Sequence, residues 1–222
     1  MKNNVIIVAG GKGLRMGSDL PKQFIPIGGR PVLMWTIEAF YNFDNDINII
    51  LVLPLSHQDY WQQLCEEYNF NVSHKIATGG DTRFHSVKNG LALVKKGIVG
   101  VQDGVRPFAS EEMIQRCFSA AHNFSAVVPV IDSTDSLRQM KDDGKSEIID
   151  RSQIRLVQTP QVFDVDILKK AYQVDYKETF TDDASVVESI GVDVHLVKGE
   201  VTNIKITTPL DLKIGALLVN SI

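Results

Sequence analysis

Short apolar runs alternate with longer segments of helical periodicity along nearly the whole chain, and this alternation limits the possible folds more than any other feature. Residues 5–9 are apolar at every position, which is typical of a strand whose sheet is covered by helices on both faces. The alternation therefore predicts an α/β fold with a doubly wound, mostly parallel sheet. The predicted strands are residues 5–9, 47–53, 72–76, 98–102, 126–130, 192–197 and 203–206. The predicted helices are residues 31–41, 57–68, 82–94, 110–122, 166–174, 181–189 and 209–220.

One polar segment interrupts this alternation. Residues 132–158 are rich in charged and hydroxyl side chains, and the pair Asp143-Gly144 favours a hairpin tip between two short strands. Composition alone is equally compatible with an excursion from a single domain and with a flexible surface insertion. The 222 residues fit one domain over residues 1–222, and we expect residues 132–158 to protrude from it as an arm.

Charge and hydropathy argue against nucleic-acid and membrane partners. The 23 basic and 27 acidic side chains give a net charge of −4 without a basic block, so we expect no nucleic-acid partner. No apolar run approaches the ~20 residues of a membrane-spanning helix, and residues 5–9 are too short for the core of a signal peptide. We therefore expect a cytoplasmic protein that does not associate with membranes. Two distant cysteines, Cys65 and Cys117, fit neither a disulfide framework nor a zinc site.

A glycine-rich segment directly follows the first predicted strand. Gly10, Gly11 and Gly13 would let backbone N–H groups approach an anion closely, as in phosphate-binding loops. Two common phosphate motifs are excluded by position: the dinucleotide fingerprint needs glycine at Met16, and the P-loop needs Lys-Ser/Thr where Arg15 and Met16 stand. This mismatch argues against a nicotinamide-dependent reductase.

Three cations lie among or shortly after these glycines. Lys12, Arg15 and Lys22 combine positive charge with exposed backbone donors, which suits a polyphosphate. The alternative is a chance cluster on a solvated turn. The number of glycines that accompany the cations favours polyphosphate binding.

A second glycine motif, GGDTR at residues 79–83, separates a predicted strand from a predicted helix, with Ser86 one turn later. A helix N-cap alone would account for Asp81 or Thr82. It would not account for two glycines accompanied by Arg83 and Ser86. The motif is therefore a second candidate binding segment.

Asp103 follows a central predicted strand at its C-terminal end, where open α/β sheets bind their ligands. A carboxylate there suits Mg²⁺, and the guanidinium of Arg106 can bind a phosphate through a fork of donors. An internal Asp103–Arg106 ion pair that only holds the loop is an equal alternative. Two later candidate residues also have purely structural alternatives. Thr181 is most simply a helix N-cap, and Lys205 on the predicted strand 203–206 could point to solvent.

These motifs together resemble a known family. GGKGLRMG at residues 10–17, followed by LPKQF at residues 20–24, is similar to the signature of the sugar-phosphate nucleotidyltransferases. The resemblance is strongest to the cytidylyltransferases that act on 2-C-methyl-D-erythritol 4-phosphate and on ribitol 5-phosphate. It extends from Val5 to Leu212, because matching segments follow in order: GGDTRFHSV, DGVRP, TPQ, TDDAS and NIKITTPLDL.

The resemblance implies a Rossmann-like nucleotidyltransferase fold. It also implies transfer of CMP from CTP to 2-C-methyl-D-erythritol 4-phosphate with release of pyrophosphate, in isoprenoid precursor synthesis by the non-mevalonate route. Two alternatives stay open: ribitol 5-phosphate as acceptor, and a regulatory module that binds nucleotide without turnover. Gly104 and Val105 replace two alanines common in the methylerythritol enzymes and look more like the ribitol relative, whereas the TDDAS segment favours methylerythritol.

The resemblance also assigns roles to individual residues. The catalytic residues would be Arg15, Lys22 and Lys205. The CTP-binding residues would be Ala9, Gly10, Gly11, Gly13, Gly80, Asp81 and Ser86. The acceptor would contact Asp103, Arg106, Arg151, Thr159 and Thr181, and Asp103 would also hold Mg²⁺ or another divalent cation. The arm would join two subunits in a homodimer, with Arg151 and Thr159 reaching the sugar phosphate in the neighbouring subunit's site.

Overall fold

Four adjacent parallel strands, in the order β6, β1, β4, β5, form the centre of the computed structural model, which describes residues 2–11 and 20–219. They are β1 (Asn3–Val8), β4 (Asn48–Leu53), β5 (Lys75–Thr78) and β6 (Ile98–Asp103). In register, Ile6 lies beside Ile50 on one side and Val101 on the other. The predictions at 5–9, 47–53 and 98–102 are confirmed, whereas β5 begins three residues later than its predicted start.

The sheet continues beyond β6 with mixed strand directions. Strand β11 (Gln161–Asp164) runs antiparallel between β6 and β7 (Ala126–Asp132), and β12 (His195–Lys198) pairs in parallel with β7. The sequence pattern did not predict β11, because four residues with only two adjacent apolar side chains give no period. The predicted doubly wound and mostly parallel α/β sheet is confirmed.

One predicted strand is wrong. Residues 203–206 do not form a strand; the N–H of Ile206 donates to the carbonyl of Val105 at 2.9 Å. The alternation of polar residues with isoleucine has a different cause. Ile206 enters a small apolar cluster below the strand ends, while Lys205 is turned towards the edge of the sheet.

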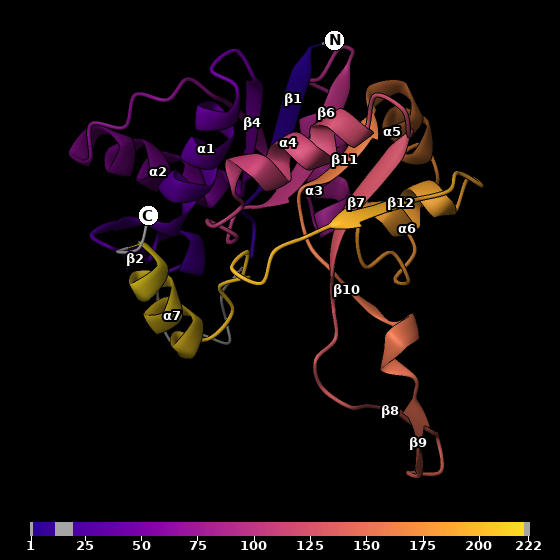
Figure 1. Ribbon diagram of the computed structural model, residues 1–222. Coiled ribbons are helices and arrows are strands. Elements are labelled where there is room, and N and C mark those ends of the chain that lie inside the picture. Colours follow the sequence, from indigo (N-terminus) through magenta and orange to yellow (C-terminus); the bar gives the residue numbers. More distant parts are fainter. Residues whose placement is uncertain (1, 12–19, 220–222) are drawn as a thin grey trace.

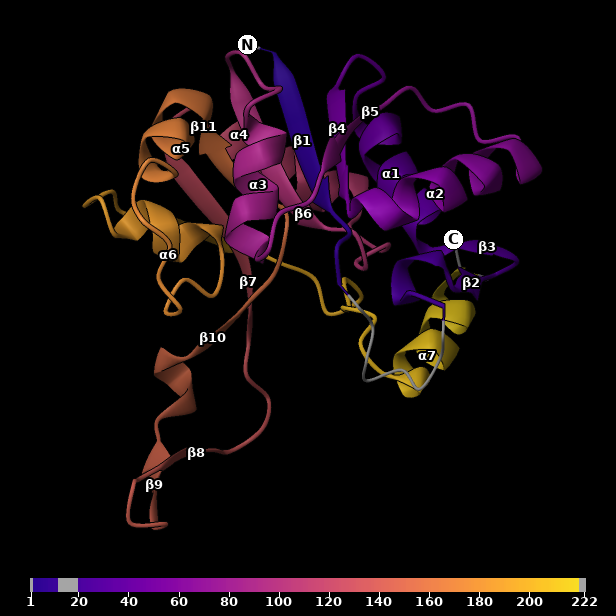
Figure 2. The ribbon, with the colours of Figure 1, turned by 180° about the vertical axis from the view of Figure 1, so that it is seen from behind.

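Helices cover both faces of the sheet, as the pattern predicted. Helices α1 (Val32–Phe43), α2 (Leu55–Glu67) and α4 (Glu111–Ala120) contribute to the core on one face, and α1 and α4 lie in front of the sheet in Figure 1. Helices α3 (Arg83–Leu91), α5 (Val165–Ala171) and α6 (Asp183–Glu188) contribute to the other face, seen in Figure 2. None of the described helices is long and apolar enough to cross a membrane.

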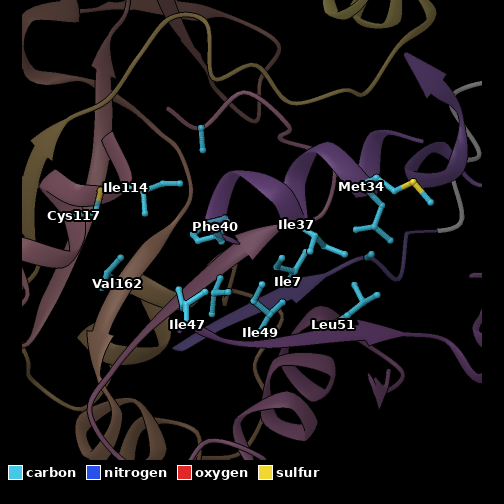
Figure 3. Close-up of a cluster of buried hydrophobic side chains, with 14 of the residues drawn as sticks. Ile7, Met34, Ile37, Phe40, Ile47, Ile49, Leu51, Ile114, Cys117 and Val162 are labelled. Atoms are coloured by element: carbon cyan, nitrogen blue, oxygen red, sulfur yellow. The ribbon is translucent and has the colours of Figure 1, made fainter. Parts of the chain in front are cut away.

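Alternate residues of the central strands enter opposite cores. Ile7 and Leu51 pack with Ile37 and Phe40 of α1, as Figure 3 shows, while Ile6 belongs to the core behind the sheet. Full burial of each such side chain contributes about 1.5–3 kcal/mol. The strand ends are thereby held rigidly at one edge.

A small third cluster lies below that edge. Helix α7 (Pro209–Val219) packs near the short hairpin of β2 (Pro26–Ile27) and β3 (Arg30–Pro31), and the turn η2 (Lys22–Phe24) precedes that hairpin. This cluster supports the segments that carry Lys22 and Lys205.

The polar segment forms a projection, as predicted. Strands β8 (Leu137–Met140) and β9 (Ser146–Ile149) form a hairpin that stands away from the body in both views (Figures 1 and 2). Gly144 adopts a φ of +78° at its tip, which confirms the turn predicted there. The base belongs to the sheet, since β10 (Arg155–Val157) pairs with the end of β7. We therefore define the arm as residues 133–154, which includes the turn η3 (Arg151–Gln153).

The two cysteines are free. Burial raises the pKa of the Cys117 thiol to about 12 and that of the Cys65 thiol to about 11. Neither thiol is therefore activated as a nucleophile at neutral pH.

Candidate active site

The carboxyl ends of β1, β4 and β6 open into a cavity of about 290 Å³. This is the edge at which open α/β sheets bind ligands. Sixteen described residues line it: Val8, Ala9, Gly10, Gly11, Lys22, Gln23, Pro54, Gly79, Gly80, Asp81, Thr82, Arg83, Ser86, Asp103, Val105 and Lys205. They come from six separate segments of the chain.

Most of the residues predicted to bind nucleotide meet at this cavity. Six of the predicted CTP-binding residues line it, namely Ala9, Gly10, Gly11, Gly80, Asp81 and Ser86. They are joined by Lys22, Asp103 and Lys205. Two further predictions, Gly13 and Arg15, lie outside the described residues.

The first glycine segment is held at its start by backbone and side-chain contacts. The N–H of Ala9 donates to the carbonyl of Val52 at 3.0 Å, and the side-chain amide of Gln23 donates to the carbonyl of Ala9 at 2.8 Å. Gln23 is almost fully buried. Sequence reasoning missed this residue, although a glutamine next to Lys22 in the LPKQF segment was a signal for it.

The second glycine segment is a turn that leads into α3. The N–H of Gly80 donates to Oγ of Ser86 at 3.1 Å, and Thr82 caps α3 by accepting the N–H of His85 at 3.3 Å. A Cβ on Gly80 would lie 2.5 Å from the Cβ of His85, so only glycine fits there. The segment is thus both a helix cap and a wall of the cavity.

Three cationic side chains surround the carboxylate of Asp103. Lys205 Nζ lies 2.9 Å from Oδ2, Arg106 Nε lies 3.5 Å from the same oxygen, and Arg83 Nε lies 3.7 Å from Oδ1. Arg106 does form the internal ion pair considered from the sequence, but Asp103 is shared with two other cations. We call these four residues the Asp103 cluster.

The neighbouring charges fix the charge state of Asp103. Burial raises the pKa of Asp103, but Arg83, Lys205 and Arg106 together outweigh burial and hold it below its ordinary value. Burial lowers the pKa of Arg106, and the neighbouring Asp103 offsets only part of this effect. An arginine starts from a value so high that it stays cationic. Asp103 is therefore ionised at neutral pH and faces positive charge on both of its oxygens.

Thr159 supports Asp103 from behind. Its hydroxyl accepts the N–H of Asp103 at 3.1 Å, and its carbonyl accepts the side-chain amide of Asn203 at 2.9 Å. Thr159 is buried within its own subunit. This placement disagrees with the expectation that Thr159 reaches a neighbouring subunit's site, because its hydroxyl is engaged next to Asp103 of the same chain.

Side chains, and not a strand ladder, hold the segment that carries Lys205. The side chain of Gln158 both donates to the carbonyl of Glu200, at 2.7 Å, and accepts its N–H, at 3.0 Å. Arg106 Nη1 donates to the carbonyl of Asn203 at 2.8 Å. Gln158 and Asn203 are buried residues that sequence reasoning did not single out.

Arg83 links the cavity to a buried carboxylate behind it. Its Nη2 lies 2.6 Å from Oδ2 of Asp183, whose Oδ1 accepts the hydroxyl of Tyr172 at 2.6 Å. Burial lowers the pKa of Arg83, but the carboxylates of Asp183 and Asp103 raise it further above its ordinary value. The partners are about a hundred positions apart in sequence, so no local pattern could have predicted this contact.

Two predicted acceptor-binding residues lie away from the cavity within the chain. Arg151 is exposed on the arm, where its Nη1 donates to the carbonyl of Thr134 at 2.5 Å. Thr181 is exposed and is not the N-cap of α6; Asp182 is, in a capping box with Ser185. Asp182 precedes the helix in extended backbone and accepts the N–H of Ser185, which explains why the cap lies one residue later than predicted.

The described residues include no group of three His, Cys, Asp or Glu side chains that could hold a metal ion by themselves. Two carboxylates line the cavity, Asp81 and Asp103, and Mg²⁺ commonly takes one or two carboxylates together with substrate phosphates. The charge of Asp103 is already compensated by its cationic neighbours. The site therefore fits a magnesium ion that arrives with a triphosphate.

Packing explains how the chain accommodates Gly104 and Val105 at the positions where two alanines were expected. A Cβ on Gly104 would lie 2.8 Å from the Cβ of Ala9, so the close approach of β1 and the loop after β6 requires glycine. Val105 is buried against Phe108 and Ile206. Both differences are thus accommodated within the loop that follows Asp103.

Comparison with known proteins gives a consistent result along the chain. A family model described as 2-C-methyl-D-erythritol 4-phosphate cytidylyltransferase matches residues 4–221. The protein of that name from Bacteroides thetaiotaomicron is 62% identical over 219 residues, covering 98% of this chain and 100% of the relative. The one from Phocaeicola vulgatus is 61% identical over 220 residues, covering 99% and 100%.

Solved structures agree. The crystal structure of 4-diphosphocytidyl-2C-methyl-D-erythritol synthase from Anaerococcus prevotii superposes with a TM-score of 0.83 at 30% identity, covering 99% of this chain and 96% of that one. The 2-C-methyl-D-erythritol 4-phosphate cytidylyltransferase from Thermus thermophilus gives a TM-score of 0.80 at 31% identity, covering 99% and 100%. The fold, the cavity and these similarities agree, and the chain belongs to the 2-C-methyl-D-erythritol 4-phosphate cytidylyltransferase family of nucleotidyltransferases.

Proposed function

We propose that this enzyme transfers CMP from CTP to 2-C-methyl-D-erythritol 4-phosphate and releases pyrophosphate. The observation that carries the proposal is the convergence of two glycine segments with Lys22, Asp103 and Lys205 around one cavity. Family membership over residues 4–221 and relatives of that name more than 60% identical support the choice of substrates. The reaction belongs to isoprenoid precursor synthesis by the non-mevalonate route.

The chemistry needs no general base. A phosphate monoester has a second pKa of about 6, so the acceptor oxygen is already ionised at neutral pH. That oxygen attacks the α-phosphorus of CTP, a new P–O bond forms, and the bond to the β-phosphate oxygen breaks with its electron pair leaving on pyrophosphate. The main obstacle is repulsion between two polyanions.

In the proposed reaction, cationic side chains offset this repulsion. Two unit charges ~4 Å apart interact by about 4 kcal/mol at an effective dielectric constant of ~20, and several such pairs act together here. In the proposed arrangement, Lys22 and Arg15 bind the β- and γ-phosphates and stabilise the leaving pyrophosphate. Lys205 faces the charge that accumulates at the α-phosphorus, and Arg106 binds the acceptor phosphate.

Asp103 acts on these cations and on the metal. It holds Lys205 at 2.9 Å and is thus able to orient the ammonium towards the reacting phosphates. In the proposal Asp103 is also the protein ligand of a magnesium ion that enters with CTP. Such an ion, when bound, neutralises triphosphate charge and stabilises the departing pyrophosphate.

We propose further that the arm completes the site of a second subunit in a homodimer. Met140 and Ile148 on the hairpin are 68% and 75% exposed, which favours a partner that covers them. Arg151 lies on the same arm and does not line the cavity of its own chain. In a dimer its guanidinium would bind the acceptor phosphate of the neighbouring site.

Pyrophosphate release tests the proposed reaction. CTP is offered with 2-C-methyl-D-erythritol 4-phosphate, with ribitol 5-phosphate, or without acceptor, each with Mg²⁺ and with EDTA. We expect release only with methylerythritol phosphate and Mg²⁺. Faster release with ribitol 5-phosphate would mean that ribitol 5-phosphate is the acceptor. Binding of CTP without any release would favour the regulatory module that binds nucleotide without turnover.

A further inference from the structure

A chain of buried polar side chains leads from the cavity to the back of the sheet. Arg83, at the first position of α3, binds Asp183, at the first position of α6, with Nη2 and Oδ2 2.6 Å apart. On its other side, Arg83 Nε lies 3.7 Å from Oδ1 of Asp103. The hydroxyl of Tyr172 donates to the second oxygen of Asp183 at 2.6 Å. One guanidinium therefore stands between two buried carboxylates.

The backbone around Asp183 makes this carboxylate a fixed anchor. Oε1 of Gln161, on β11, accepts the N–H groups of both Asp183 and Ala184, at 3.0 and 2.9 Å. The same glutamine donates to Asp182, the N-cap of α6, at 2.7 Å. Asp183 and Gln161 are fully buried. The carboxylate cannot shift without disturbing the start of α6.

Packing alone does not require the ion pair. The ring of Phe84 on α3 stacks on Tyr172 at 4.6 Å and on Phe180 at 5.9 Å, so apolar contacts already join these elements. A buried ion pair usually contributes little net stability compared with apolar side chains of the same size. Arg83 also lines the cavity, with about a third of its side chain exposed, whereas Asp183 does not line it.

We propose that Arg83 is a positioning residue for the proposed cytidylyl transfer, on which this inference rests: anchored by Asp183 and Tyr172, its guanidinium fixes the Asp103 carboxylate in the orientation that directs Lys205. Arg83 faces Oδ1 of Asp103, while Lys205 and Arg106 face Oδ2. Cations on both oxygens restrain rotation of the carboxylate. Loss of Arg83 leaves Oδ1 free to turn towards Lys205 and to hold its ammonium away from the phosphates.

Asp183→Asn is the most informative single variant, because its carboxylate contacts Arg83, which lines the cavity, and Tyr172, which does not. We expect kcat to fall by about 10-fold or more, since small displacements of positioned groups cost up to ~100-fold. We expect the Kd for CTP, measured by calorimetry without acceptor, to change by less than about 3-fold, because Asp183 does not line the cavity. Thermal unfolding of each variant reports any loss of stability separately.

Rescue by a conservative variant gives a readout that a purely structural role would not move. The charged groups that face Asp103 are Arg83 from α3, Arg106 from the loop after β6, and Lys205. Arg83→Gln removes the cation that faces Oδ1, so its kcat should fall as in Asp183→Asn. Arg83→Lys keeps the charge, and its kcat should fall less.

A matched control uses an ion pair away from the cavity. Arg30 binds Glu38 with the same 2.6 Å contact, so Arg30→Gln removes an equivalent cation. We expect kcat of this variant to equal that of the wild type. We also expect the double variant Arg83→Gln/Asp183→Asn to be no slower than Arg83→Gln alone, because Asp183 acts through Arg83.

The outcomes separate this inference from the proposed reaction. If the wild type is active and Asp183→Asn unfolds at lower temperature but keeps the wild-type kcat, the inference alone is overturned. A wild type without turnover overturns the proposed function and the inference with it. If Asp183→Asn does not fold, Arg83→Gln and Tyr172→Phe decide the question, and unchanged kcat in both overturns the inference.

Discussion

The Asp103 cluster and the arm use the same types of charged side chain in opposite surroundings. In the cluster, three cations face one buried carboxylate at the end of a rigid strand. On the arm, the pairs Lys141–Glu147 and Lys145–Asp143 are largely exposed. Exposed pairs are screened and contribute about 0–1 kcal/mol, whereas buried charges are costly to leave unpaired. Burial therefore gives the cluster its chemistry, whereas the role proposed for the arm requires a partner.

The largest expected effect comes from replacing Lys205 of the Asp103 cluster, and replacing Lys145 of the arm provides the comparison. Lys205→Ala should lower kcat by about 10²–10³-fold, because it removes a cation that stabilises charge in the transition state. Lys145→Ala, whose side chain is 82% exposed on the arm, should leave kcat unchanged. Pyrophosphate release under saturating substrates measures both. Near-normal turnover of folded Lys205→Ala would contradict the role assigned to Lys205.

Replacing the arm tests its proposed role independently of the Asp103 cluster. Replacement of residues 134–154 by a short Gly-Ser linker should give a monomer in analytical ultracentrifugation and lower kcat/KM for the acceptor by about 100-fold, since Arg151 is lost. The affinity for CTP should stay close to wild type, because the arm does not line the cavity. A dimer with full activity after this replacement would show that the arm has no such function.

How far the sequence predicts the structure also differs between the regions. Buried strands such as residues 5–9 and 98–102 were predicted correctly because both of their faces are apolar. Asp103 and Ser86, which line the cavity, were singled out because strand ends and glycine turns are common places for ligands. By contrast, the alternation at residues 203–206 indicated a strand that does not exist, since its isoleucines enter a local cluster.

Contacts between distant segments were beyond sequence reasoning. Arg83 and Asp183 are each part of a recognisable motif, but nothing local shows that they touch. The capping position of Asp182 and the burial of Thr159 depend likewise on how β11 lies between β6 and β7. The arm was predicted from composition and from Asp143-Gly144, because turn chemistry is local.

Acid pH should reveal how much the buried carboxylate of Asp103 contributes to the free energy of unfolding. The pKa of Asp103 lies below its ordinary value of 3.8, so its stabilising contribution is complete above that pH and is lost as the pH falls through its lower, folded-state pKa. The wild type should therefore lose stability below pH 3.8 more steeply than Asp103→Asn, by up to about 1.4 kcal/mol per pH unit. Urea unfolding between pH 7 and pH 2.5 measures this difference. Parallel curves would mean that Asp103 gains nothing from its cations.

The smallest effect is expected for an ion pair on the arm. Glu147→Gln removes the partner of Lys141, and both side chains are about half exposed. The free energy of unfolding in urea should change by less than about 1 kcal/mol, and turnover should not change. A loss of several kcal/mol would show that the hairpin is a stabilising part of the domain.

Mixed dimers test most directly whether the Asp103 cluster of one subunit and the arm of another form a single site. One subunit carries Lys22→Ala and the other Arg151→Ala, each with its own affinity tag, so that only heterodimers are purified. Each parent variant should be nearly inactive at low acceptor concentration, while the heterodimer retains one intact site of two and should regain about half of the wild-type turnover. Heterodimers as inactive as their parents would contradict a site shared between subunits.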